Sequence, residues 1–200
     1  MWPWEHLAVG YLCYSLSVRA LGRTAPRAWP VVAVALGTQF PDLVDKPLAW
    51  TFGVLPSGHS LAHSLFAALP AAALAVTLAW ALGRPRVGAA FAFGYLSHLP
   101  GDVFYPVLVG GVPNYDFLFW PVVPASASET SVGFAEMVRT LFARYVSELA
   151  GGEVSAYVAV ELGLLASVVL LWVADGAPPF GSLWSWLRRR GRPTETEASP

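Results

Sequence analysis

Apolar runs of helix length follow one another along most of the chain, and this pattern constrains the fold more than any other feature. The runs cover residues 4–21, 28–40, 60–82, 87–108 and 154–173. A helix that crosses a bilayer needs about 20 mostly apolar residues, and it satisfies its backbone polar groups internally. The pattern therefore predicts an all-α fold, a polytopic membrane helix bundle of about five transmembrane helices.

The composition points in the same direction. Hydrophobic residues make up 56% of the 200 residues and charged residues only 12%, whereas a soluble domain carries about a quarter charged residues. The nine tryptophans and seven tyrosines have amphipathic rings that favour the membrane interface. We expect a multi-pass protein of the cell (plasma or inner) membrane with the lipid bilayer as partner. The net charge of −1 gives no basis for nucleic-acid binding.

Four stretches outside the apolar runs complete the expected organisation. Residues 45–58 mix Pro and Gly with aromatic residues and predict an interfacial loop. Residues 110–124 are aromatic and turn-rich, which predicts a re-entrant or interfacial element, and residues 132–149 predict an amphipathic surface helix. The tail 179–200 is basic, then polar, and is expected to be a partly disordered cytoplasmic segment. Residues 1–178 would then form a single membrane-embedded helical domain.

Two helix boundaries bear on the candidate site. Pro41 is expected to end the second helix, because the residue before a proline avoids the α region. The third helix is expected to begin near Ser60. On that reading His59 and His63 lie at its start, four residues apart and on one face.

The arginines predict an orientation in the membrane. Basic residues concentrate in cytoplasmic loops. Nine of the twelve basic residues fall between the first and second runs, between the third and fourth, or in the tail: Arg19, Arg23, Arg27, Arg84, Arg86, Arg188, Arg189, Arg190 and Arg192. The C-terminus is therefore expected in the cytoplasm and the N-terminus outside.

The same topology gathers the histidines at the opposite, extracytoplasmic end. All four histidines of the chain fall there, together with three aspartates: His6, His59, His63, His98, Asp42, Asp45 and Asp102. Ionisable groups at membrane depth are costly and indicate a functional site. Because the orientation came from arginines alone, this clustering is independent support for one site.

These residue types are ligands of hard and borderline divalent metal ions. Imidazole and carboxylate groups together suit zinc. His98 and Asp102 lie four apart on a predicted helix, and Asp42 and Asp45 converge if their turn is helical. The set exceeds the needs of one tetrahedral ion, which favours a centre of two or three divalent ions that activates water.

The order of the motifs resembles the YdjM family of membrane-bound metal-dependent hydrolases. The matching pieces are Glu5-His6, Phe40-Pro41-Asp42 with Asp45, His63-Ser64, Ser97-His98 through Asp102, and Trp120-Pro121. The resemblance covers roughly residues 1–124. It departs from the family pattern at Asp42 and Asp45, which are three apart instead of two.

The resemblance implies a fold with a metal-dependent active site. The family is similar in ligand order to zinc-dependent phospholipase C and P1 nuclease, which suggests hydrolysis of a small phosphoester or lipid substrate. His6, Asp42, His63, His98 and Asp102 would bind divalent metal. His59 and Asp45 would be further ligands or a catalytic acid–base pair.

Other readings remain open at the level of sequence. The polar residues could form a structural network, and Asp42 could cap a helix. A membrane protein that binds metal or translocates ions without hydrolysis is a second candidate function, although few ionisable residues continue through the cytoplasmic halves of the runs. Haem ligation by paired histidines is a third, and the neighbouring carboxylates argue against it.

Overall fold

A computed structural model describes residues 1–108, 110–125, 133–150 and 156–181. Within these ranges the chain is all-α, as predicted. The helices are α1 (Pro3–Gly22), α2 (Ala28–Trp50), α3 (Leu65–Ala81), α4 (Pro85–Leu108), the short 3-10 helix η1 (Asp116–Phe119), α5 (Phe134–Ala150) and α6 (Ala156–Ala174). Most of the expected tail lies outside the described residues, so its cytoplasmic, partly disordered state stays a prediction.

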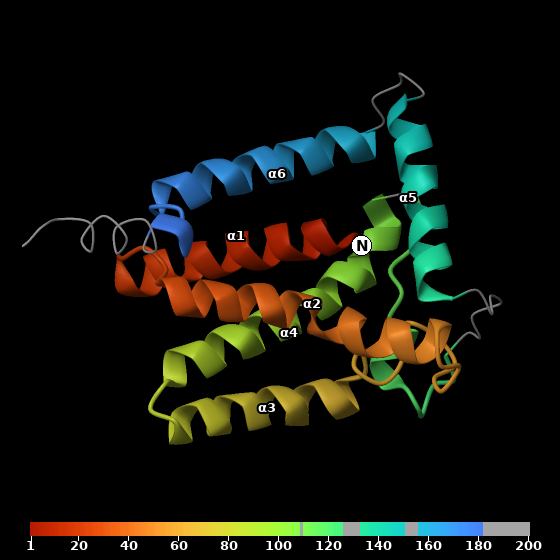
Figure 1. Ribbon diagram of the computed structural model, residues 1–200, viewed down its shortest axis with the longest axis horizontal. Helices are drawn as coiled ribbons and strands as arrows, with labels where there is room; N and C mark the ends of the chain where they lie inside the picture. Colours follow the sequence, from red (N-terminus) through yellow and green to blue (C-terminus); the bar gives the residue numbers. More distant parts are fainter. Residues whose placement is uncertain (109, 126–132, 151–155, 182–200) are drawn as a thin grey trace, which may run out of the picture.

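Five of the helices run lengthwise and one crosses their end. α1, α2, α3, α4 and α6 extend along the long direction of the molecule, whereas α5 lies across the end where the N-terminus is found (Figure 1). α4 packs against α1, α2 and α3, and α6 packs against α1. α5 forms at the stretch where an amphipathic helix was predicted, and its place on a membrane surface stays a prediction.

Small residues allow α2 and α4 to approach closely. A Cβ atom on Gly37 would lie 2.3 Å from the Phe91 carbonyl oxygen, and one on Gly94 would lie 2.4 Å from the Val34 carbonyl oxygen. Both distances are far below van der Waals contact, so these glycines set the spacing of the two helices. The contact matters because α2 and α4 carry most of the candidate site.

The predicted end of the second helix was wrong. α2 continues through Pro41 and Pro47 to Trp50, so Asp42 and Asp45 lie inside a helix. A proline inside a helix removes one backbone hydrogen bond but does not by itself end the helix, particularly where neighbouring helices pack against it. Pro41 is buried against such neighbours. The interfacial loop therefore begins at Thr51, later than predicted.

The predicted start of the third helix was also wrong. α3 begins at Leu65, and Ser64 is its N-cap, with its side-chain oxygen accepting a hydrogen bond from the Phe66 N–H. His59 and His63 consequently lie in an irregular segment, not on one helical face. The buried carboxylate of Asp45 binds the backbone of this segment.

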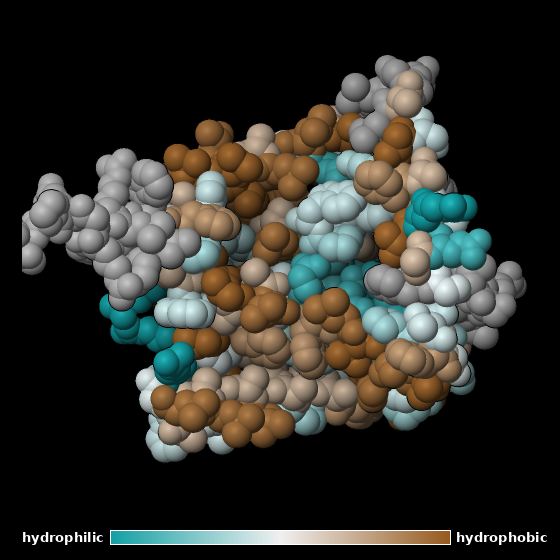
Figure 2. All heavy atoms as spheres, in the orientation of Figure 1, coloured by the Kyte–Doolittle hydropathy of each residue, from teal (hydrophilic) through white to brown (hydrophobic). Residues whose placement is uncertain are grey.

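One helix is long and apolar enough, by length and composition, to cross a membrane among the described residues. It is the Tyr157–Ala174 part of α6, with a mean hydropathy of 2.1, and α3 is apolar but shorter. Side chains of both helices are exposed on the flanks of the bundle, where Figure 2 shows mostly hydrophobic atoms. The prediction of about five transmembrane helices stays a prediction.

Polar side chains attach α6 to α1 at both ends. At one end the Asp175 carboxylate accepts hydrogen bonds of 2.6 Å from Tyr11 and Ser15 and of 2.8 Å from Arg19 Nε. Burial disfavours the charged form of this carboxyl group. The hydrogen bonds that it accepts outweigh that effect, so the pKa of Asp175 is lowered. At the other end Tyr157 donates to Glu5 and Trp4 donates to Glu161, at 2.6 and 2.7 Å.

We predict that Gly94→Ala destabilises the bundle. The added methyl would overlap the Val34 carbonyl oxygen, and overpacking of this kind costs about 1–3 kcal/mol. Thermal unfolding in detergent should show a lower Tm.

Gly163→Ala is the matched control, because a Cβ there meets nothing within 4 Å. Alanine also has the higher helix propensity, so its Tm should be equal or higher. Equal effects of the two substitutions would contradict the close α2–α4 contact.

Candidate metal centre

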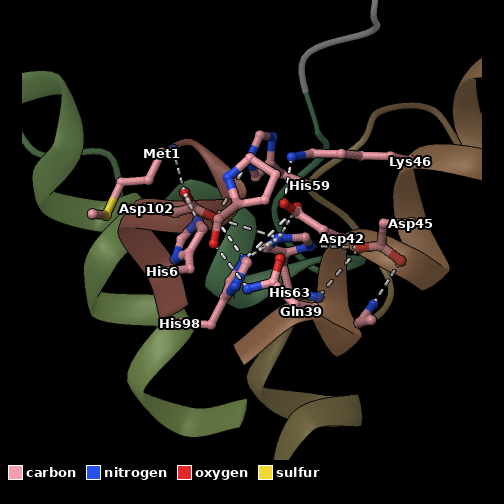
Figure 3. A network of polar contacts seen from close by, with 12 residues as sticks. Met1, His6, Gln39, Asp42, Asp45, Lys46, His59, His63, His98 and Asp102 are labelled. Carbon is pink, nitrogen blue, oxygen red and sulfur yellow. Dashed lines mark hydrogen bonds and ion pairs between the residues drawn. The ribbon is translucent and has the colours of Figure 1, made fainter. Parts of the chain in front are cut away.

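Four buried side chains from three parts of the chain converge at the end of the bundle near α5. Asp42 comes from α2, His63 from the residue before the α3 N-cap, and His98 and Asp102 from α4. One ligand atom of each lies within 4.8 Å of all the others. Figure 3 shows the four side chains pointing toward one another.

The spacing of the four atoms matches one metal ion. His63 Nε2 lies 3.0 Å from His98 Nε2, 3.4 Å from Asp42 Oδ1 and 3.3 Å from Asp102 Oδ2. His98 Nε2 lies 3.8 Å from Asp42 Oδ1 and 3.0 Å from Asp102 Oδ2. Donors bound tetrahedrally to zinc at about 2.1 Å are about 3.4 Å apart. The distances therefore scatter around the value that such an ion requires.

Hydrogen bonds on the far side of each imidazole aim Nε2 into the cluster. His98 Nδ1 lies 2.7 Å from the Thr38 carbonyl oxygen, which can only accept. His63 Nδ1 lies 2.8 Å from Asp45 Oδ2. Nδ1 is thus assigned a hydrogen in both rings. Nε2 of each ring is a lone-pair donor whenever the ring is neutral, as it is in protein metal sites.

The two carboxylate oxygens in the cluster have no hydrogen-bond donor among the described residues. Asp42 Oδ1 and Asp102 Oδ2 are both buried and receive no hydrogen bond. Buried polar atoms are almost always paired. These oxygens face two imidazole Nε2 atoms, so the group needs a positive charge, either a second proton on His63 or a metal ion. A divalent metal ion fits both the ligand types and their spacing.

The negative charge of the surrounding carboxylates also acts on His63. Burial disfavours its imidazolium form, but the three surrounding carboxylates raise the pKa of His63 to about 10. The centre therefore attracts positive charge strongly, either a proton or a metal ion, and metal binding would release the proton.

Asp45 holds the segment that carries His63. Its carboxylate accepts backbone N–H bonds from Ser60, Ala62 and His63 at 2.9, 2.8 and 3.2 Å, in addition to the His63 ring bond. These bonds hold residues 60–63 in an irregular turn, and α3 begins only after it, at Leu65 behind the Ser64 N-cap. Both oxygens of Asp45 are occupied by these bonds and its side chain is fully buried. Its predicted role as a catalytic acid–base is untested, and the contacts favour a positioning role.

His6 lies behind the cluster. Its ring stacks on the His98 ring with centroids 3.6 Å apart, and its Nε2 lies 3.1 Å from Asp102 Oδ1. That oxygen is not the one that faces the other ligands. The structure thus brings His6 to the centre but leaves it outside the group of four, and its predicted ligand role stays a prediction.

His59 lies at the solvent side. Its side chain is 42% exposed, and its Nε2 is 3.5 Å from Asp102 Oδ2. Its ring contacts the rings of His63 and Phe117. All seven predicted site residues are therefore close together, but only four place an atom in the central group.

Sequence reasoning missed Lys46 and the Thr38 carbonyl. Lys46 Nζ donates to Asp42 Oδ2 at 2.5 Å. The signal for Lys46 was present, since a lysine four residues after an aspartate pairs with it on a helix, but the helix was expected to end earlier. Asp116 is exposed on η1 and lies outside the group.

The fold and the cluster together define an all-α protein with a buried Asp/His centre able to hold a metal ion. A family model described as YdjM inner membrane protein matches residues 1–177. The chain therefore belongs to the YdjM family, as the motif order predicted. A comparison with curated proteins found no match, and neither did one with solved structures.

We predict that Asp45→Ala destabilises the protein. It leaves the Ser60, Ala62 and His63 N–H groups buried without an acceptor, which costs about 1–3 kcal/mol for each. The Tm in detergent should fall by several degrees.

Asp116→Ala is the control for loss of an aspartate near the same end. Because Asp116 is exposed, the change in unfolding free energy should stay within about 0.5 kcal/mol. An unchanged Tm for Asp45→Ala would contradict the anchoring of the segment by Asp45.

Proposed function

We propose that this protein is a membrane-bound, metal-dependent hydrolase that acts on phosphoesters at the extracytoplasmic membrane interface. The observation that carries the proposal is the group of four buried ligand atoms, namely two imidazole nitrogens and two carboxylate oxygens that receive no hydrogen bond. A purely structural network would pair donors with acceptors, whereas a metal centre needs acceptors alone.

Zinc is the metal ion that we propose for this centre. Two imidazole nitrogens and two carboxylate oxygens suit zinc or a similar divalent ion. Asp42, His63, His98 and Asp102 would hold this ion, supported by Asp45 and by the Thr38 carbonyl. His6 and His59, beside Asp102, are the groups left for the second or third ion that the sequence suggested.

A divalent ion in this centre would supply Lewis acidity, which lowers the pKa of water and offsets charge on a phosphoryl group. The chain's own groups would do the rest. Asp45 holds His63 in place, and the buried walls exclude bulk water from the ligands. His59 is the exposed imidazole of the centre, so its Nε2 is positioned to take up and release a proton during hydrolysis.

Several features support a site at the membrane interface. The family is named for an inner membrane protein, and apolar side chains are exposed along α3 and α6. The arginines between α1 and α2 and between α3 and α4 lie at the end of the bundle opposite to the candidate centre. Five lengthwise helices with the N-terminus and the centre outside and the C-terminus in the cytoplasm are consistent with this distribution.

We predict that the purified protein binds at least one zinc ion per chain. His98→Ala and Asp42→Asn should each abolish that binding, because each removes one of four ligands. Inductively coupled plasma mass spectrometry after dialysis measures the content, and Asp116→Ala is the control. Full metal content in both ligand variants would refute the centre.

We predict that the zinc-loaded protein hydrolyses p-nitrophenyl phosphate or phosphatidic acid in detergent. His59→Ala should keep its zinc but lower kcat by about 10²–10⁴, the usual loss when a general acid or base is removed. A metal-loaded wild-type protein without activity on either ester would favour the alternative, a non-hydrolytic metal-binding or ion-translocating membrane protein. Loss of zinc in His59→Ala would make His59 a ligand instead.

A further inference from the structure

The chain has a single lysine, Lys46, and it lies at the candidate centre. All of the other basic residues are arginines. Lys46 reaches from α2 over Asp42, with Nζ 2.5 Å from Asp42 Oδ2 (Figure 3). It therefore contacts the oxygen that faces away from the other ligands, while Asp42 Oδ1 faces the group of four.

The surrounding loop fixes the aliphatic part of Lys46. A Cβ atom on Gly58 would lie 3.2 Å from Lys46 Cγ and 3.2 Å from the Trp50 ring, so only glycine lets the loop close over both side chains without a tight contact. The ammonium group lies 5.8 Å from the centroid of the Trp50 ring, within the range of a cation–π interaction. The position of the charge is thus built by helix and loop together.

Lys46 and His59 mark the side on which the centre opens. The side chain of Lys46 is 16% exposed and that of His59 is 42% exposed, whereas the side chains of His63 and His98 are fully buried. These two residues are therefore partly exposed side chains with an atom beside the carboxylates of the group of four. Among the described basic side chains, the arginines of the helix connections lie at the other end of the bundle.

A lysine ammonium group can bind Asp42 and a second partner at the same time. An ammonium group has three N–H donors on a flexible stem, and the bond to Asp42 uses one of them. A guanidinium in this place would bind the carboxylate of Asp42 in a rigid fork and leave less freedom to turn toward a ligand. A second partner for Lys46 must be an acceptor, and an anionic one gains most.

We propose that Lys46 binds a non-bridging oxygen of the substrate's phosphoryl group beside the metal centre, so that the site selects anionic phosphate esters. This inference rests on the proposed function, which it extends from metal-dependent hydrolysis to the recognition of substrate charge. The shared chemistry is a phosphate dianion or monoanion, carried either by a lipid headgroup or by a soluble ester.

The test is the binding of inorganic phosphate to zinc-loaded, detergent-purified protein by isothermal titration calorimetry. Wild-type protein should bind phosphate, and Lys46→Met should bind it at least about tenfold more weakly, the loss expected for one charge-assisted hydrogen bond. Zinc content is measured on the same samples. Lys46→Arg keeps the charge but changes the donor geometry, and its affinity should lie between the two.

Arg139→Met is the matched control. Arg139 is an exposed residue of α5, which crosses the same end of the bundle, so this variant also removes one positive charge there. Phosphate affinity should be unchanged. An equal loss in Arg139→Met and Lys46→Met would show a general electrostatic effect and overturn the assignment to Lys46.

The outcomes separate this inference from the function on which it rests. If zinc-loaded wild-type protein binds no phosphate, the proposed phosphoester chemistry fails. If wild-type protein and Lys46→Met bind phosphate equally well at equal zinc content, only the role of Lys46 fails, and the lysine serves Asp42 alone.

Vesicles distinguish the two sources of the phosphate group. The kcat/KM of wild-type protein and Lys46→Met is compared on phosphatidic acid in phosphatidylcholine vesicles and on p-nitrophenyl phosphate. A loss on both substrates supports recognition of the phosphate group itself. A loss on the lipid alone assigns Lys46 to headgroups, and no loss on either overturns the proposal.

Discussion

Electrostatic repulsion among four buried acceptor atoms is the constraint on which the candidate site depends. The Nε2 atoms of His63 and His98 lie 3.0 Å apart, and oxygens of Asp42 and Asp102 complete the group. Such a group is unfavourable by itself and becomes favourable around a cation. Burial strengthens this coupling, because the low dielectric of the protein interior that makes charges costly also strengthens their attraction to a bound ion.

The rest of the bundle holds these four atoms in place. The close approach of α2 and α4 at Gly37 and Gly94 fixes the distance between the helices that carry three of the candidate ligands. The fourth candidate ligand, His63, belongs to no helix. It is positioned by Asp45, whose carboxylate binds both the imidazole and the backbone of its segment. The centre is thus built from one rigid helix pair and one segment folded around a buried anion.

The residues around the centre differ in how far their side chains are exposed to solvent. His6 stacks behind His98 in the buried interior, whereas His59 and Lys46 reach the open side. Buried groups can orient ligands but cannot easily exchange protons or meet a substrate. The partly exposed groups can do both, and for this reason the proton transfer is proposed for His59 and the phosphate recognition for Lys46.

The sequence by itself determined the all-α class, the family, the residue types of the centre and their place at one end of the bundle. Apolar run length and motif order are local properties, and the four-residue spacing of His98 and Asp102 sufficed to place both on one helix face. The tertiary structure decided what depends on packing and on long-range hydrogen bonds. It carried α2 through Pro41 because neighbouring helices support that turn, and it began α3 only at Leu65, after a segment whose backbone Asp45 binds. It also distinguished the four candidate ligands from the residues that support them. The oxygen or nitrogen that faces an ion is selected by hydrogen-bond partners far apart in the chain, and the sequence does not show these.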